Sequence, residues 1–242
     1  MIIINDEKLK QQLIESVHLD QALPSVIFTQ MKLCQFDAHE YICVEFEPLA
    51  NLYFMLKGKC MVTKLLSNGK RNLISFYEGF TLFGEIELIE NTKASCSVEV
   101  LESALCLMIP HEPCRNILLA DIQFMNRLCS FFTQKMRHND HNASITQHCT
   151  TEEKLASYII STQRNHQFRE NHTQLAEYLG CSHRQLLRAL KQFCLRGWLK
   201  KTETGYQLIC LDELKAAAND IYMLDNEMAR IFIGQLSKNG AQ

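Results

Sequence analysis

Several classes of protein are excluded by what this sequence has little of. It holds no run that approaches the ~20 consecutive apolar residues needed to cross a bilayer. Proline is scarce, with four residues, and 47% of the chain is apolar against 21% charged, which is not the composition of a mostly disordered chain. Its 11 cysteines form no CxxC pair and their number is odd, so no disulfide framework is expected. The sequence predicts a globular protein with reduced, semi-buried thiols.

A secretory signal is also lacking at the start of the chain. Three isoleucines are followed at once by Asp6, Glu7 and Lys8, so neither the long apolar region nor the cleavage pattern of a signal peptide is present. We therefore expect the protein to stay in the cytoplasm. Its 242 residues are consistent with one or two domains, at roughly 150 residues each.

Charge is unevenly distributed along the chain. Residues 1–120 carry 10 basic and 15 acidic side chains, a net charge of −5, whereas residues 151–209 carry 9 and 5, a net charge of +4. The formal net charge of −2 for the whole chain therefore combines an acidic segment with a basic one. A basic segment of this kind favours a polyanionic partner, which the total charge would argue against.

Short runs with strand character fill residues 28–110. They alternate, are rich in Val, Ile, Phe and Tyr, and have turn signals between them. Gly58 and the Asn68-Gly69 pair indicate tight turns, and the second is a strong hairpin signal. This stretch predicts an all-β barrel or roll. Its runs cover residues 41–46, 52–56, 60–66, 72–77, 96–101 and 104–109.

A heptad pattern, with apolar or small residues at alternating steps of three and four, begins after Asp121. It consists of Ile122, Met125, Cys129, Phe132, Met136, Asn139, Ala143 and Thr146. A helix of roughly 25 residues cannot bury such a stripe alone. The stripe either packs on the β-roll of the same chain or pairs with its copy in a parallel homodimer. The homodimer is favoured, because the stripe extends beyond what one small domain could cover.

Residues 172–193, HTQLAEYLGCSHRQLLRALKQF, have the pattern of two short helices joined by a tight turn, after another helix at 152–161. Thr173 can cap the first helix, Gly180 can end it, and Ser182 can cap the second. Both helices have one apolar face, and Ala176 is small enough for them to approach closely. The pattern predicts a helix-turn-helix. Its apolar positions are Leu175, Ala176 and Leu179, then Leu186, Ala189, Leu190 and Phe193.

The second of these helices presents polar side chains suited to the major groove of DNA. Arginine can donate two hydrogen bonds to guanine, glutamine can pair with adenine, and an exposed leucine can contact a thymine methyl. Backbone donors at the start of the first helix can hold a phosphate. Residues 196–209 read as a β-hairpin, or wing, with two lysines over the DNA backbone and Trp198 in the core. The predicted DNA-binding residues are Thr173, Gln174, Ser182, His183, Arg184, Gln185, Leu187, Arg188, Lys191, Lys200 and Lys201.

The order of these parts resembles the family of the cAMP receptor protein and FNR, and most closely its YeiL-like branch. The resemblance is carried by the β-roll, the segment GEIELIE at 84–90, the long helix, and a winged helix in which HTQ, AEYLG and LGCS precede a basic helix. It implies an α+β fold: an N-terminal cyclic-nucleotide-binding-like jelly roll, a dimerisation helix, and a C-terminal winged helix-turn-helix. The implied domains are an effector-sensing domain at 1–120, a dimerisation helix and hinge at 121–148, and a DNA-binding domain with a C-terminal extension at 149–242.

The function that this resemblance implies is a homodimeric transcription regulator that binds a two-fold related operator. Family positions for base reading fall on His183, Arg184 and Arg188. RNA polymerase is a candidate further partner, and no membrane is involved. The alternatives are a ligand-sensing module that regulates another protein without binding DNA, and an enzyme. No nucleophile motif, zinc signature or phosphate-binding loop supports an enzyme, so we predict none.

The effector pocket transfers less well from the family. Nucleotide-binding members hold the ribose with a Gly-Glu pair, here Gly84 and Glu85, and the cyclic phosphate with an arginine whose position falls on Ser95 or Cys96. A phosphate buried without a cation costs several kcal/mol, and Lys93 is the only cation nearby in the sequence. The sequence therefore argues against a cyclic nucleotide. The effector stays unknown, and no cofactor is predicted.

Other signals are weaker. No cysteine precedes Cys34, which does not match an FNR-type iron–sulfur cluster. Cys34, Cys96 and Cys106 are unranked candidates for a redox sensor, with inert buried thiols as the favoured interpretation. Polar residues near the end of the long helix could share a metal, but a solvated helix end explains them equally, so no metal is predicted. These are His138, Asp140, His141, His148 and Cys149.

A C-terminal addition follows Leu211. Asp212 can cap a helix that runs through Ala218, and the segment at 226–236 is apolar enough to pack on the body or across a dimer. Its sequence carries no motif that assigns it a role.

Overall fold

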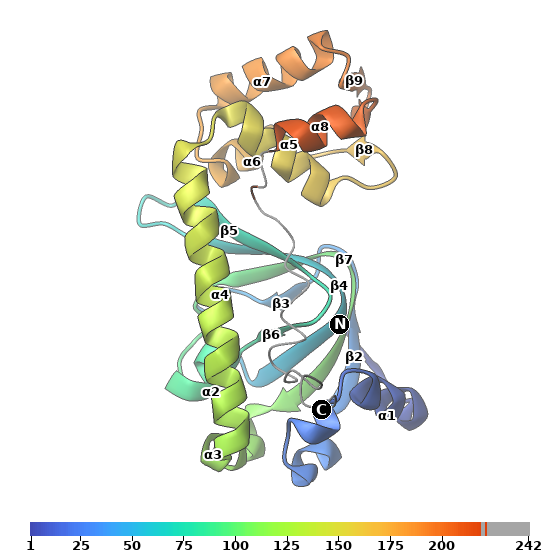
Figure 1. Ribbon diagram of the computed structural model, residues 1–242, viewed down its shortest axis with the longest axis vertical. Helices are drawn as coiled ribbons and strands as arrows, with labels where there is room; N and C mark the ends of the chain where they lie inside the picture. The colour runs from blue at the N-terminus through green and yellow to red at the C-terminus, as the bar shows by residue number, and fades with distance from the viewer. Residues whose placement is uncertain (219–220, 222–242) are drawn as a thin grey trace, which may run out of the picture. The chain divides into compact units, whose positions relative to one another are not determined.

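A computed structural model describes residues 1–218 and 221 (Figure 1). They form two compact units, one of residues 1–62 and 77–138 and the other of residues 63–76 and 139–221 without the residues outside the description. Three elements run from one unit into the other: β4 (Asn51–Leu65), β5 (Arg71–Glu78) and the long helix α4 (Ile122–His148). No helix among the described residues is both long and apolar enough to cross a membrane.

A seven-stranded antiparallel sheet is the framework of the β-roll. Its main path has the order β1-β2-β7-β4-β5, with β3 on β7 and β6 on β4. The register pairs Lys32 with Met108 and Phe36 with Ala104 along β2 and β7. The remaining strands are β1 (Ile2–Ile4), β2 (Lys32–Phe36), β3 (Tyr41–Cys43), β6 (Thr81–Phe83) and β7 (Ser97–Pro110). The predicted β-roll is confirmed.

Two long strands replace four of the predicted short runs. The runs at 52–56 and 60–66 join in β4, and those at 96–101 and 104–109 join in β7. Gly58, predicted to mark a turn, lies inside β4 with φ +112°, and a Cβ there would come within 2.6 Å of the Ala104 Cα. This glycine therefore permits close approach to β7, and the prediction of a turn is wrong. The Asn68-Gly69 hairpin is confirmed, since the Gly69 N–H donates to the Leu66 carbonyl.

Short helices precede, interrupt and follow the strands of the β-roll. The N-terminal strand β1 and helix α1 (Glu7–Ser16) were not predicted, although Asp6 accepts a hydrogen bond from the Leu9 N–H as an N-cap. Two 3₁₀ turns follow before β2. Helix α2 (Glu85–Glu90) lies in the GEIELIE segment, and α3 (His111–Ala120) precedes the long helix.

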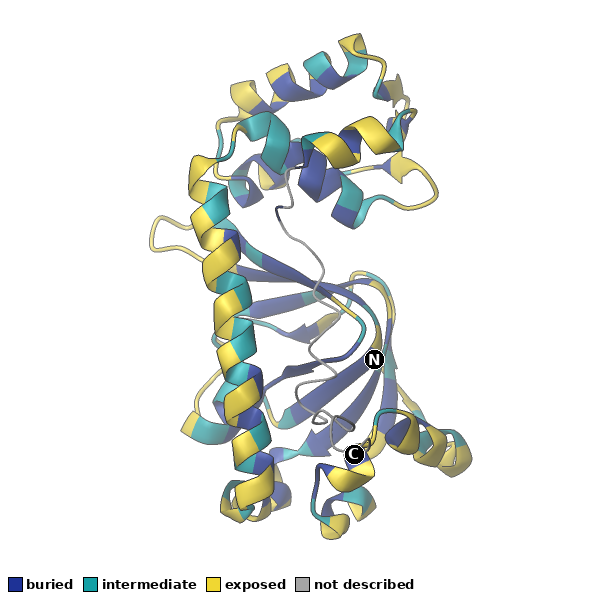
Figure 2. Ribbon diagram, in the orientation of Figure 1, coloured by how far each residue is buried: buried dark blue, intermediate teal, exposed yellow. Residues whose placement is uncertain are grey.

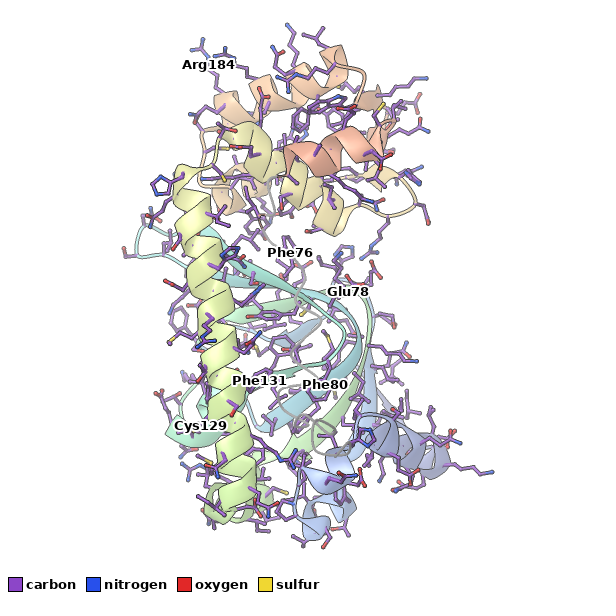
Figure 3. All side chains as sticks on the ribbon, viewed as in Figure 1. Phe76, Glu78, Phe80, Cys129, Phe131 and Arg184 are labelled. Carbon is purple, nitrogen blue, oxygen red and sulfur yellow. The ribbon has the colours of Figure 1, made fainter. Side chains whose placement is uncertain are left out.

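Helix α4 confirms the predicted long helix and carries two stripes. Phe124, Leu128 and Phe131 are fully buried, at steps of four and three. The predicted heptad stripe lies elsewhere: Ile122 is 71% exposed and Met136 68%. Figure 3 shows the labelled Phe131 on the sheet side of α4 and Cys129 on the other side. The β-roll of the same chain therefore covers the first stripe, whereas the residues of the heptad stripe alternate between exposed and half-buried.

The second unit is a winged helix. Helix α5 (Thr151–Thr162) confirms the helix predicted at 152–161 and begins with a capping box between Thr150 and Glu153. The small sheet has the order β8-β10-β9. Its core contains Tyr158, Phe168 and Phe193, each no more than 1% exposed. The other elements are β8 (Gln167–Phe168), α6 (His172–Tyr178), α7 (His183–Leu195), β9 (Leu199–Thr202), β10 (Gly205–Leu208) and α8 (Leu211–Ala217).

The C-terminal helix begins two residues earlier than predicted. Cys210, not Asp212, is the N-cap residue of α8, and no side chain caps it, so Asp212 lies in the first turn. There its carboxylate is placed to complement the positive end of the helix dipole. The apolar segment predicted at 226–236 lies outside the described residues.

Candidate nucleic-acid interface and β-roll pocket

Helix α7 has the start and the buried face that the sequence predicts. Gly180 has φ +61°, the left-handed conformation that ends α6, and Ser182 then caps α7. The Gln185 N–H donates to Ser182 Oγ at 3.2 Å, and the Ser182 N–H donates to Gln185 Oε1 at 2.8 Å. The buried face consists of Leu186, Ala189, Leu190 and Phe193.

The opposite face of α7 is exposed and polar (Figure 2). Figure 3 shows the labelled Arg184 extending away from the helix. All eleven predicted DNA-binding residues are exposed: Thr173, Gln174, Ser182, His183, Arg184, Gln185, Leu187, Arg188, Lys191, Lys200 and Lys201. Among the described residues, no salt bridge joins any of their basic side chains to a carboxylate. This face can therefore supply hydrogen-bond donors and positive charge to a polyanion.

Two predicted roles change with the capping geometry. Asn171, not Thr173, caps α6, and its Oδ1 accepts from the Thr173 N–H at 2.9 Å and the Gln174 N–H at 3.3 Å. Those backbone donors are thus already engaged, so a phosphate contact there falls to the side chains. Gln185 likewise uses its amide oxygen to complete the α7 cap, and bidentate pairing with adenine requires that oxygen.

The predicted wing is a hairpin of β9 and β10. Its register pairs Lys200 with Gln207 and Lys201 with Tyr206, and both lysines are exposed. Gly205 at the turn has φ +154°, and a Cβ there would lie 2.4 Å from the Phe168 carbonyl oxygen, so β8 packs directly against it. Trp198 is half-buried against Phe193, with ring centroids 5.2 Å apart, in agreement with a core role.

His172 is a residue of this surface that sequence reasoning missed. Its ring lies 6.3 Å from that of His183 and 6.1 Å from that of Tyr206. Burial, together with the neighbouring His183 and Lys201 side chains, lowers the pKa of His172. The pairing of a residue in α6 with one in α7 depends on the angle between the helices, which no sequence pattern reports.

The four candidate pocket residues lie in the β-roll on either side of one segment. Gly84 and Glu85 are at the start of α2, and Ser95 and Cys96 come just before β7. Gly84 has φ +90° before α2, and a Cβ there would come within 2.5 Å of the Asn51 carbonyl oxygen. Glu85 is only 3% exposed. Ser95 donates its N–H to Glu87 Oε1 at 2.8 Å, and Cys96 is partly exposed beside it. The hydrogen bond from Ser95 to Glu87 therefore ties the end of the loop back to α2.

Lys135 of α4 supplies the cation in this part of the β-roll. Its Nζ lies 2.5 Å from Glu85 Oε1 and donates to the Leu82 carbonyl at 2.9 Å. The ammonium also lies 5.0 Å from the Phe83 ring centroid and 5.4 Å from those of Tyr77 and Phe131. Burial alone would lower the pKa of Lys135, but the Glu85 carboxylate outweighs it and raises that pKa. Lys135 is therefore a cation at neutral pH.

Lys135 corrects the expectation that Lys93 is the nearby cation. Lys93 is exposed and makes no salt bridge within the described part of the chain. Lys135 follows Phe131 by four residues, so it continues the buried stripe of α4. That spacing was readable in the sequence, but which strand or helix faces the stripe was not.

The three unranked thiols fall into two different environments. Cys34 and Cys106 lie directly opposite each other on β2 and β7, and both are fully buried. Burial raises the pKa of Cys34 to about 12 and also raises that of Cys106. Cys96 lies beside Cys43 instead, and its pKa is lowered. No disulfide joins any of the described cysteines, and none of the described residues form a group of three or more that could hold a metal.

The fold and the site thus define a class of protein: a β-roll joined by a long helix to a winged helix-turn-helix. The family model described as "Cyclic nucleotide-binding domain" matches residues 33–121. The regulatory protein YeiL of Escherichia coli O157:H7 is 34% identical over 175 residues, which cover 72% of this chain and 80% of that protein. A CRP-like cAMP-activated global transcriptional regulator of Mycobacterium tuberculosis is 19% identical over 181 residues, 71% of this chain and 81% of that one.

Solved structures agree on the fold. A regulator assigned to the Crp/Fnr family from Eubacterium rectale has a TM-score of 0.71 at 13% identity, covering 83% of this chain and 97% of that one. A CRP-family transcriptional regulator from Thermus thermophilus has a TM-score of 0.60 at 17% identity, covering 79% of this chain and 100% of that one. The chain belongs to the CRP/FNR family of transcriptional regulators. It is a regulator and not an enzyme, as predicted.

Proposed function

We propose that this chain is a homodimeric regulator that reads a two-fold related operator through α7. The observation that carries the proposal is the division of α7 into two faces. Its apolar side chains are buried in the winged helix, while His183, Arg184 and Arg188 are exposed. An ordinary surface helix does not need to gather three cationic or titratable side chains near its start. A recognition helix does.

The proposed roles follow the chemistry of each side chain. Arg184 and Arg188 are one helical turn apart and can each donate two hydrogen bonds to a guanine. Leu187, 41% exposed, is suited to a thymine methyl. Phosphates would be held by side chains at the start of α6, on α7 and on the wing, namely Thr173, Gln174, Lys191, Lys200 and Lys201.

The dimer is proposed to form through α4. Its heptad stripe, in which Ile122 and Met136 are largely exposed, has the side-chain pattern of a two-stranded parallel coiled coil. Two copies related by a two-fold axis would present two α7 helices about one turn of DNA apart, ~34 Å. The proposed domains are residues 1–120, 121–148 and 149–242, acting in the cytoplasm, with RNA polymerase as a candidate further partner.

The β-roll is proposed to receive a signal other than a cyclic nucleotide. The Glu85 carboxylate, which the family resemblance assigns to a ribose, is already held by Lys135 at 2.5 Å. A nucleotide would have to displace a charge-assisted bond in a buried site, and no arginine stands at position 95 or 96 to bind its phosphate. The signal is instead an effector of other chemistry or a redox change.

The test is a set of DNA-binding isotherms at several salt concentrations. Arg188→Ala should weaken specific binding by roughly 1–3 kcal/mol and relax base preference, whereas Lys200→Ala should weaken binding to all sequences and lower the salt slope by about one. Lys57→Ala, which removes an exposed basic side chain of β4 in the β-roll, is the matched control and should change neither. Wild-type protein without salt-sensitive binding to any genomic fragment would instead favour a module that regulates another protein.

A further inference from the structure

Two thiol pairs lie in the β-roll, and they differ in access to solvent. Cys34 and Cys106 are cross-strand neighbours inside the core, each with no exposed surface. Cys43 and Cys96 lie where β3 pairs with the beginning of β7, and Cys96 is partly exposed. An oxidant dissolved in water can therefore reach the second pair without unfolding the sheet, but not the first.

The Cys43–Cys96 pair is close enough for its sulfurs to interact. Strand register places Cys43 opposite Val98, two residues after Cys96, at a point where a bulge shifts the pairing. The Cys43 thiol donates a hydrogen bond to the Cys96 carbonyl oxygen, with Sγ 3.5 Å from that oxygen. A thiol that already lies against the backbone of the second cysteine, beside a bulge, needs a side-chain rotation and a small shift of the loop to form a disulfide.

The charges around the pair distinguish the two sulfurs. The hydrogen bond from Cys43 lowers the pKa of Cys96; burial opposes this, and the nearby Lys135 ammonium supports it, against the carboxylates of Glu85 and Glu87. The same hydrogen bond and burial raise the pKa of Cys43. Cys96 is thus the sulfur that ionises first, and Cys43 stays protonated beside it. A thiolate next to a thiol is the arrangement of an attacking and a resolving cysteine.

We propose that Cys43 and Cys96 form a dithiol that responds to peroxides by closing to a disulfide. The proposal rests on the proposed function, because it names the chemistry of the signal that the β-roll receives. The Cys96 thiolate attacks one peroxide oxygen and the O–O bond breaks, which leaves a sulfenic acid and a hydroxide. The hydroxide takes up the proton that Cys96 released on ionising and becomes the first water. The Cys43 thiol then attacks the Cys96 sulfur, the S–O bond breaks, and the hydroxyl leaves with the thiol proton as a second water. Two thiols and one hydrogen peroxide give one disulfide and two waters.

Formation of the disulfide would act on α2, whose Glu85 is the ion-pair partner of Lys135. Cys96 ends the loop that follows α2, and α2 carries Glu85, the partner of Lys135 on α4. Oxidation removes the Cys96 negative charge from beside Lys135 and ties the loop to β3. The oxidation state of the two cysteines would therefore alter the Glu85–Lys135 contact between α2 and α4.

The experiment maps disulfides in the full-length reduced protein after treatment with stoichiometric hydrogen peroxide. Free thiols are blocked under denaturing conditions and the chain is cleaved after glutamate. Such cleavage isolates Cys43 in residues 41–45 and Cys96 in residues 91–99, apart from Cys34 and Cys106. The expected result is a cross-linked 41–45/91–99 species and the loss of two thiols per chain. Cross-links at other cysteines, or no loss of thiols, would overturn the proposal.

Three variants separate the roles. Cys96→Ser should lose the cross-link, and Cys43→Ser should stop at a sulfenic acid on Cys96 that dimedone traps. Cys34→Ser is the matched control and should cross-link as the wild type does. DNA affinity is then compared before and after oxidation, with a change of about fivefold or more expected. A cross-link that leaves DNA affinity unchanged refutes regulation by this pair, whereas absence of DNA binding in both states refutes the proposed function and leaves the mapped disulfide standing.

Discussion

Two ion pairs, one in each unit, show how differently the two halves of this protein use charge. Lys135 and Glu85 in the β-roll lie 2.5 Å apart with side chains 16% and 3% exposed. Arg196 and Glu152 in the winged helix lie 2.9 Å apart with side chains 44% and 36% exposed. The first pair is part of the interior and must be complete for the interior to be stable. The second is screened by solvent and leaves the surrounding basic surface available for a partner.

The largest effect is expected from breaking the buried pair. Lys135→Met leaves the Glu85 carboxylate buried without its cation, which typically costs about 3–5 kcal/mol. The free energy of unfolding, measured with urea at neutral pH, should fall by that amount. Lys135→Met combined with Glu85→Gln removes both charges and should lose clearly less. Equal losses in the single and double variants would mean that packing, and not the unpaired charge, sets the cost.

A smaller effect is expected where the winged helix depends on caps. Ser182→Ala removes the hydroxyl that accepts from the Gln185 N–H, so α7 should lose roughly 1 kcal/mol of stability. Ser182→Thr retains a hydroxyl and is the control. Thermal unfolding and DNA affinity are measured together. An alanine variant that unfolds as the wild type does would show that the capping box does not stabilise the start of α7.

The smallest effect is expected from the exposed pair. Glu152→Gln should change the free energy of unfolding by about 0–1 kcal/mol, because solvent and salt screen the attraction to Arg196. The difference from wild type should shrink further as salt rises from low to physiological concentration. Urea unfolding at two ionic strengths measures it. A loss as large as that of Lys135→Met would remove the distinction between the two units.

The helix-turn-helix was largely predictable because its signals are local. Gly180 and Ser182 lie within one turn of the helix ends that they define, and the apolar spacing of α7 identifies its buried face. The same holds for the Asn68-Gly69 hairpin. The wrong prediction in this part concerns a shift of two residues: Asn171 and not Thr173 caps α6. Both side chains are able to cap a helix, and the path of the backbone decides which of them does.

The β-roll pocket was not predictable in the same way. The sequence offered only Lys93 as a cation near the candidate pocket, and it gave no partner for Glu85. The cation came from Lys135, 50 residues further along the chain. Gly58 was misread for a similar reason, since β7 approaches so closely that no side chain fits there, whereas the sequence suggested a turn.

The sequence by itself determined the order of a β-roll, a long helix and a winged helix, the basic face of α7, and the heptad stripe on α4. These follow from periodicity and capping, which act over a few residues. The tertiary structure decided that Lys135 neutralises Glu85, that Gly58 lies against β7, and that Cys43 rather than another thiol lies against Cys96. Each is a contact between segments distant in the sequence, and only packing sets the distance between such segments.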